Sequence, residues 1–182
     1  MLQHKMILRD SSLSEIKKIV NGCLNELYTH DRFLFERNGG KGVSEWCLVF
    51  RFAYYLQKKI DNYYVDCDFN SSWEIGGTNV IEKHGKPIMN QDGTITKRFV
   101  DIIIHKRDID VNNDFICFEI KKWNNNVKKE REKDRNNLRQ LTSSYGYLYG
   151  FHLIFGKNKR DTKWTIFKNG EIIEENKKRL FF

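Results

Sequence analysis

Two apolar segments rich in isoleucine and valine constrain the fold of this chain more than any other feature. Val100–His105 and Phe115–Ile120 are nearly continuous apolar runs, as expected for strands that other layers cover on both faces. The connection between them, residues 107–114, is polar and turn-like, so the two runs can pair as an antiparallel hairpin. We therefore predict that these are central strands of a sheet.

Three charged residues lie at the open end of this predicted hairpin. Pairing centred on Val111 places Asp101 opposite Lys121, and Glu119 shares a face with Lys121 because strand side chains alternate. Two carboxylates beside one ammonium can hold a hard divalent cation and orient a water against a phosphodiester. Charged residues also commonly end buried strands and pair with one another at the surface. The spacing alone therefore leaves both interpretations open.

Helical periodicity predicts three helices. Ser12 and Glu15 have capping-box spacing, and apolar residues then recur at helical intervals to about Tyr28. Ser44 can cap a second helix after a Gly-rich segment, and its apolar face would comprise Trp46, Val49, Phe50, Ala53 and Leu56. Residues 124–141 are mostly charged or Asn, which predicts an exposed helix. We favour the interpretation that its charges form a solvated surface over the alternative that they form a phosphate-binding stripe.

Shorter patterns predict the remaining strands and turns. The strand-like segments are Tyr63–Phe69, Tyr147–Phe155 and Lys163–Phe167. Asn169-Gly170 is a turn signal, and Asp92-Gly93 predicts a tight hairpin between Ile88-Met89 and Thr94-Ile95. No internal repeat is visible, and 182 residues with 40% hydrophobic content suit one compact domain.

Composition limits the cellular locations and the kinds of partner that we expect. No stretch approaches the roughly 20 apolar residues of a membrane span, and the N-terminus lacks the apolar core of a signal peptide. We therefore expect a cytoplasmic protein with no membrane partner. The net charge of +8 favours a polyanionic partner, although charge alone does not decide for nucleic acid.

The four cysteines do not have the spacing of a metal site. Cys23, Cys47, Cys67 and Cys117 are far apart and form no CxxC or Cys/His cluster, whereas a tetrahedral zinc site needs ligands that converge in pairs. We expect all four to be reduced and buried.

The charged residues carry a resemblance to a known family. Val100-Asp101 followed by Phe118-Glu119-Ile120-Lys121 resembles the signature of the PD-(D/E)xK nuclease superfamily, with Val100 in place of the motif's proline. The resemblance covers roughly residues 43–167. It implies an α/β restriction-endonuclease-like core, a central mixed β-sheet flanked by helices in the order αβββαβ, within a single nuclease-like domain over residues 1–182 and with an additional N-terminal helix.

The resemblance also implies a metal-dependent nuclease and assigns its residues. Asp101, Glu119 and Lys121 would be catalytic, and Glu45 on the preceding helix would join them, although an acid in a first turn is also favoured by the helix dipole. The ligands of Mg²⁺ or Mn²⁺ would be Asp101, Glu119, Glu45 and the backbone of Ile120. Gln140 and Tyr145 are five residues apart, whereas the exonuclease-like branch has a spacing of four, so that branch is not assigned.

Residues beside the motif are candidates for contact with nucleic acid. Lys97, Arg98, Lys122 and Trp123 flank the two motif strands and could bind phosphates or stack on bases. They could equally be a solubilising rim with a half-buried Trp. His84 and His105 are discounted as general bases, because one lies in an irregular segment and the other near the far end of its strand.

Three functional hypotheses follow. The first is a Mg²⁺- or Mn²⁺-dependent nuclease that cuts DNA rather than RNA by metal-activated water. The second is a catalytically silent nucleic-acid-binding or regulatory protein on the same scaffold, since fold does not fix function. The third is a plain structural or interaction domain. A homodimer would suit cleavage of both strands of a duplex, but no sequence feature requires it.

Overall fold

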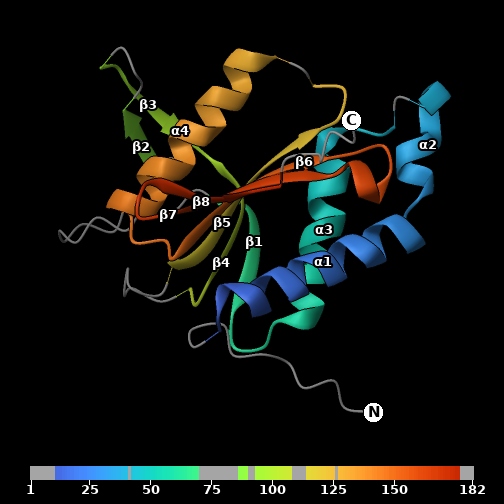
Figure 1. Ribbon diagram of the computed structural model, residues 1–182, viewed down its shortest axis with the longest axis horizontal. Coiled ribbons are helices and arrows are strands. Elements are labelled where there is room, and N and C mark those ends of the chain that lie inside the picture. The colour runs from blue at the N-terminus through green and yellow to red at the C-terminus, as the bar shows by residue number, and fades with distance from the viewer. Residues whose placement is uncertain are drawn as a thin grey trace, which may run out of the picture.

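The structure is a computed structural model of the 182-residue chain, and it describes residues 11–40, 42–69, 86–89, 93–107, 114–125 and 127–176. Its helices are α1 (Leu13–His30), α2 (Phe33–Gly40), α3 (Glu45–Lys59), α4 (Lys128–Ser144) and the 3₁₀ helix η3 (Lys159–Asp161). Its strands are β1 (Tyr64–Phe69), β2 (Lys86–Met89), β3 (Ile95–Arg98), β4 (Val100–His105), β5 (Asp114–Lys122), β6 (Tyr149–Phe155), β7 (Lys163–Lys168) and β8 (Glu171–Glu175). Figure 1 shows their arrangement.

Six of these strands form one mixed sheet in the order β1-β4-β5-β6-β7-β8. Only β5 and β6 pair in parallel, and all the other neighbours are antiparallel. A parallel pair needs a crossover connection, which α4 supplies here. The predicted α/β class is therefore confirmed, and the two apolar runs are β4 and β5 near the centre of the sheet.

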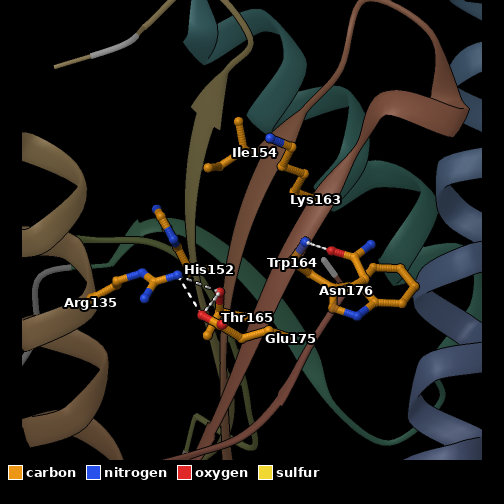
Figure 2. A pocket seen from close by; sticks show the side chains of 8 residues that line it. All are labelled: Arg135, His152, Ile154, Lys163, Trp164, Thr165, Glu175 and Asn176. Atoms are coloured by element: carbon orange, nitrogen blue, oxygen red, sulfur yellow. Dashed lines mark hydrogen bonds and ion pairs between the residues drawn. The ribbon is translucent and has the colours of Figure 1, made fainter. Parts of the chain in front are cut away.

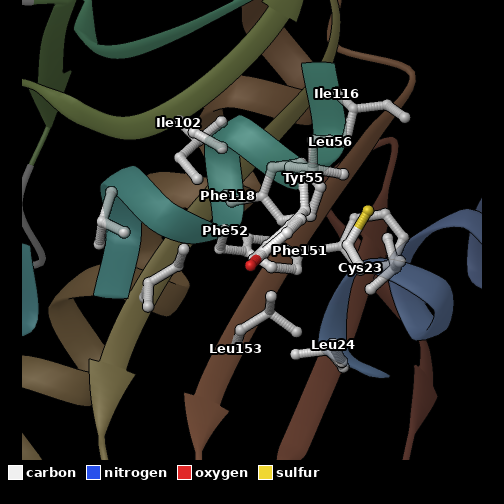
Figure 3. Packing of buried hydrophobic residues seen from close by; sticks show 14 of the residues in the cluster. Cys23, Leu24, Phe52, Tyr55, Leu56, Ile102, Ile116, Phe118, Phe151 and Leu153 are labelled. Atoms are coloured by element: carbon white, nitrogen blue, oxygen red, sulfur yellow. The ribbon is translucent and has the colours of Figure 1, made fainter. Parts of the chain in front are cut away.

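Helices cover both faces of this sheet (Figure 1). On one face α1 and α3 pack against strand side chains such as Ile102, Phe118 and Phe151 in the larger core (Figure 3). On the other face Leu138 and Leu141 of α4 pack against Ile103 and Cys117 in a smaller core. This double cover explains why both faces of β4 and β5 are apolar. Within the described residues, no helix is long and apolar enough to span a membrane.

The pairing of β4 with β5 differs from the predicted register. Ile102 pairs with Phe118 and Ile103 with Cys117, so the hairpin is centred one residue earlier than Val111. Continued by one position, this register brings Asp101 level with Glu119, and the predicted pairing of Asp101 with Lys121 is wrong. Asp101, Glu119 and Lys121 still share the face that α4 covers, because side chains alternate.

The predicted apolar face of α3 is partly wrong. Its buried residues include Leu48, Val49, Phe52, Ala53, Tyr55 and Leu56, and Trp46 and Phe50 instead lie exposed on the outer side. The helix has apolar residues on more than one side, so periodicity does not identify which side packs against the sheet.

The charged helix α4 is less exposed than predicted. It buries two polar residues, Asp134 and Asn137, together with Leu138, Leu141 and Thr142. Because three of these five buried residues are polar, the composition of the segment did not indicate that this side of the helix is buried. Three further elements, α2, η3 and β8, were not predicted at all.

Local signals were otherwise accurate. Ser12 and Glu15 form the predicted capping box, and Asn169 and Gly170 both have positive φ in the turn between β7 and β8. The hairpin of β2 with β3 pairs Met89 with Ile95, while Asp92 of its turn lies outside the described residues.

The cysteines are free, as expected, but not all of them are buried. Cys23 and Cys117 lie in the core, Cys67 is partly exposed and Cys47 is exposed. The prediction that all four are buried is therefore wrong for two of them, and Cys47 is on the outward side of α3 because its neighbour Leu48 takes the inward position.

Gly42 allows the chain to enter α3 in the right direction. Its φ is +73°, and a Cβ there would come within 2.7 Å of the Trp123 ring and 2.9 Å of the Leu34 carbonyl. Ser44 then caps α3 by accepting a hydrogen bond from the Cys47 N–H at 3.4 Å. Only glycine combines this φ with this close approach, so the position of Glu45 at the start of α3 depends on it.

Gly42→Ala is therefore expected to lower the unfolding free energy by about 2 kcal/mol or more, because it adds a clash to an unfavourable φ. Gly93→Ala is the matched control, because Gly93 has φ of +80° but no heavy atom within 4 Å of the added Cβ. Urea denaturation of both variants measures the difference. Equal losses of stability would show that the Trp123 contact does not matter.

Candidate active site

Charged side chains from four elements meet on the face of the sheet that α4 covers, near the start of β4 and the end of β5. Asp101 comes from β4, Glu119 and Lys121 from β5, Glu45 from the first turn of α3, and Asp134 from α4. Lys121 interacts electrostatically with all four carboxyl groups, and Asp101 also interacts with the other three. The structure therefore brings together the four residues that the sequence assigned to catalysis, and it adds Asp134.

The ammonium group of Lys121 lies among the oxygens of this site. Its Nζ is 3.1 Å from the Ile120 carbonyl, 3.3 Å from Asp134 Oδ2 and 3.5 Å from Glu45 Oε1. The Lys121 side chain is only 13% exposed. Two of these partners, Ile120 and Glu45, belong to the predicted metal ligands, so the ammonium interacts with part of the oxygen set that a cation would use.

Backbone and amide groups fix the two motif carboxylates. The Ile120 N–H donates to Asp101 Oδ2 at 2.6 Å, and Asn137 Nδ2 donates to Glu119 Oε1 at 3.2 Å. Each carboxylate thus has one oxygen held by the protein, and its second oxygen can serve another partner. Glu45 is held similarly, because the Lys122 N–H donates to its Oε2 at 2.9 Å.

Burial disfavours the ionised form of these carboxyl groups and so raises their pKa. It raises the pKa of Asp101 to about 6, despite the opposing charge of Lys121. It also raises the pKa of Glu119 well above the usual range, and Asp101 adds to the effect. Burial alone would lower the pKa of Lys121, but the carboxylates around it, Asp134 foremost, raise it above its ordinary value. The site therefore contains more carboxyl groups than the single ammonium of Lys121 can pair with.

Asp134 and Asn137 are the site residues that sequence reasoning missed. Asp134 is 6% and Asn137 4% exposed, although the segment was interpreted as a solvated helix. Their spacing contains a usable signal, because positions 134, 137, 138 and 141 fall on one helical face and the last two are leucines. Polar residues in register with an apolar stripe face the interior, and this criterion would have found them.

A row of polar side chains continues from Glu119 across the sheet. Glu119 pairs with His152, His152 with Thr165, and Thr165 with Glu175. Burial lowers the pKa of His152 to about 3, so its imidazole is neutral. No described residue hydrogen-bonds to its Nε2, which lies 3.8 Å from Asp134 Oδ2.

This row ends at a cavity of about 270 Å³ (Figure 2), lined by Arg135, His152, Ile154, Lys163, Trp164, Thr165, Glu175 and Asn176. Arg135 of α4 donates to Thr165 Oγ1 at 3.0 Å and to Glu175 Oε1 at 2.6 Å. His152 therefore belongs both to the wall of the cavity and to the surroundings of the carboxylates. The cavity lies beside the candidate site.

The predicted nucleic-acid contacts are not presented to solvent as a group. Lys122 is 9% exposed and donates to the Val43 carbonyl. The Trp123 ring stacks against Phe35 at 5.8 Å between centroids. The side chains of Lys97 and Arg98 lie outside the described part of the chain. A role of these four residues in binding stays a prediction.

His105 is far from the carboxylate site and has its own acidic partner. His105 is buried, and its Nε2 lies 2.7 Å from Asp66 Oδ2, in an ion cluster with Arg107 on the sheet edge. His84 lies outside the described residues.

The donor chemistry of the site fits a hard divalent cation. Its oxygens are those of carboxyl groups and a backbone carbonyl, and the carboxyl groups outnumber the one ammonium of Lys121. Among the described residues, no group of three or more His, Cys, Asp or Glu side chains is arranged to hold a metal ion. Mg²⁺ commonly needs only one or two protein carboxylates, because waters and substrate phosphates complete its shell. Asp101 and Glu119 meet that requirement.

Comparisons of the chain with family models, with curated proteins and with solved structures find no match.

Asp134→Asn is expected to become more stable relative to the wild type as the pH rises from about 4 to about 7 in chelator. Burial raises the pKa of Asp134 from 3.8 to about 6, so the folded state binds this proton more tightly than the unfolded chain. Its contribution to stability is then present below about pH 4 and is lost as the pH rises through 6. Asparagine has no such titration.

Urea denaturation of both proteins at several pH values measures this difference in unfolding free energy. Glu132→Gln, at an exposed position of the same helix, is the control and should show no comparable trend. A difference between Asp134→Asn and wild type that stays constant over this pH range would contradict the prediction.

Proposed function

We propose that this chain is a metal-dependent nuclease with a restriction-endonuclease-like core, which hydrolyses phosphodiester bonds of nucleic acid, DNA in preference to RNA. The observation that carries the proposal is the meeting of Asp101, Glu119 and Lys121 with Glu45 and Asp134 beneath α4. Burying several carboxylates around one ammonium costs several kcal/mol per ion. Strongly perturbed ionisable groups of this kind gather at functional sites.

The order of elements supports the same proposal. The segment from α3 to β6 contains a helix, three strands of the main sheet, a helix and a further strand in the order α3-β1-β4-β5-α4-β6. This is the αβββαβ order that the motif resemblance implies, with β2 and β3 inserted after β1. The helices α1 and α2 and the strands β7 and β8 are then additions to the core.

The residues of the chain have separable roles in the proposed reaction. Asp101, Glu119, the Ile120 carbonyl and Glu45 would hold Mg²⁺ or Mn²⁺. The metal ion, when bound, supplies positive charge that activates a water and offsets charge on the scissile phosphate. Asn137 and the Ile120 N–H keep the two motif carboxylates in position.

Lys121 and the helix above it complete the site. The Lys121 ammonium orients the attacking water or pairs with a nonbridging phosphate oxygen, because it remains protonated among the carboxylates. The covering α4 limits access of bulk water, which strengthens these electrostatic interactions.

One observation favours a second candidate function. Lys121 already contacts Ile120 and Glu45, and the described residues form no cluster of three acids or histidines that holds a metal. A nucleic-acid-binding or regulatory protein without turnover could keep Lys121 as a permanent substitute for the cation. Activity and metal binding distinguish the two candidates.

Cleavage assays test the nuclease. Supercoiled plasmid, linear duplex, single-stranded DNA and RNA are incubated with Mg²⁺, Mn²⁺ or EDTA. We expect metal-dependent cutting that falls on the order of 10²-fold or more in Glu119→Gln, because a preorganised charge is lost from the reacting centre. Glu132→Gln, on the exposed side of α4, should cut like the wild type. Robust cutting by Glu119→Gln would refute the assignment.

Metal binding has a readout that does not need activity. Saturating Mg²⁺ should raise the melting temperature of the wild type at pH 7.5, since a ligand that binds only the folded state stabilises it. About 1 kcal/mol of stabilisation corresponds to roughly 2–4 °C in a protein of this size. Glu119→Gln should lose the shift. Equal shifts in both proteins would place the metal elsewhere.

A further inference from the structure

Three large aromatic side chains form a line on the outer side of α3. Trp46, Phe50 and Tyr54, which we call the aromatic stripe, are 45%, 57% and 50% exposed. They are four residues apart, so they lie one above another along the helix. Single exposed apolar residues are ordinary, whereas these three exposed rings lie on the same side of one helix, and grouped exposed apolar side chains mark interaction surfaces.

The geometry of the aromatic stripe suits flat, stacking partners. The Trp46 and Phe50 ring centroids are 6.0 Å apart with an interplanar angle of 37°, so the rings lie beside each other without covering each other's faces. Both rings, at about half exposure, can accept a planar group from solvent. Nucleobases freed from a duplex stack on aromatic side chains in this way, with little dependence on sequence.

Positive charge accompanies the aromatic stripe. After Glu45 the helix contains no acid, and Arg51 and Lys58 lie beside the stripe, whereas Lys59 pairs with Glu26 of α1. The Arg51 guanidinium lies 4.9 Å and the Lys58 ammonium 5.5 Å from the Tyr54 ring centroid. Arg51 also pairs with Asp31 at 2.8 Å, which fixes its position. Rings beside cations suit a partner that has both bases and phosphates.

The aromatic stripe begins next to the proposed active site. Trp46 follows Glu45, whose carboxylate accepts the Lys122 N–H at 2.9 Å and lies 3.5 Å from Lys121 Nζ. A strand bound along the outer side of α3 would therefore approach the carboxylates at the beginning of that helix. A duplex keeps its bases stacked on one another and cannot use such rings.

We propose that the aromatic stripe of α3 binds single-stranded nucleic acid by base stacking and directs it toward the carboxylate site. This inference rests on the proposed nuclease function and specifies its substrate as single strands. It assigns Trp46, Phe50 and Tyr54 to substrate binding and excludes them from the chemical step.

Fluorescence anisotropy tests the binding. Labelled oligo-dT, oligo-rU and a hairpin duplex are titrated in EDTA with the full chain carrying Glu119→Gln, which prevents turnover. Adding Trp46→Ala, Phe50→Ala and Tyr54→Ala together should weaken single-strand binding at least about tenfold, because each stacked base contributes substantially to affinity. Duplex binding should not change.

Tyr64→Ala is the matched control. Tyr64 is 47% exposed on β1, and the Arg107 guanidinium lies 4.4 Å from its ring centroid, so it has similar chemistry on another element. It should bind single strands like the parent. A second variant, Trp46→Phe with Tyr54→Phe, keeps the rings and should retain affinity within about threefold, which attributes the loss in the triple variant to stacking. Unchanged duplex binding by the triple variant shows that it remains folded.

The outcomes separate this inference from the proposed function. If the triple variant binds and, with Glu119 restored, cleaves single strands like the wild type, the inference is wrong and the nuclease stands. If no variant cleaves with any metal but stacking is lost as expected, the nuclease fails and the binding surface stands. If the triple variant changes only self-association in light scattering, the aromatic stripe is a contact between copies of the chain, and the inference is wrong.

Discussion

Several carboxyl groups surround the one ammonium group of Lys121, and the surrounding sheet and helices hold these charged side chains in place. Lys121 contacts oxygens of Ile120, Asp134 and Glu45 within 3.5 Å. Such a group of charges is stable in the interior only if nearly every polar atom has a partner and the surroundings hold it rigidly. The apolar sheet provides the rigidity, and the partners are the Ile120 and Lys122 N–H groups of β5 and the Asn137 amide of α4.

The helix α4 shows how one element serves several requirements. Its apolar positions Leu138 and Leu141 pack on the sheet, while Asp134 and Asn137 on the same side reach the carboxylate site. Asn136 and Gln140 bond to the backbone of Met89, and Arg135 bonds to Thr165 and Glu175. Movement of α4 would therefore affect the site, the β2–β3 hairpin and the cavity together.

The helix α3 links the site to the surface in a different way. Its inner side packs in the main core through Phe52 and Leu56, and its first turn holds Glu45 at the end of β5. Its outer side presents the aromatic stripe. Because one rigid helix holds both Glu45 and Trp46, the proposed binding surface and the proposed reaction centre have a defined relation. This relation depends on the turn at Gly42.

Local patterns predicted much of the fold, because they reflect interactions within a few residues. The capping box of α1, the strands β4 and β5 and the turn at Asn169-Gly170 need no distant partner to be recognised. The short helix α2 and the strand β8 were missed. The residues Ile172 and Ile173 of β8 are partly exposed, so this strand has no clear apolar pattern, and it forms because β7 offers an unpaired edge.

The candidate site also has a part that local sequence patterns predicted and a part that they did not. The sequence by itself determined that Asp101, Glu119 and Lys121 lie near one another, because alternation along two adjacent strands permits little else. Only the tertiary structure decided that Asp101 is level with Glu119, that Asp134 and Asn137 join them, and that Trp46 and Phe50 face solvent. The pairing register depends on the whole sheet, and the buried side of a helix depends on what it packs against, so neither is encoded within a single segment.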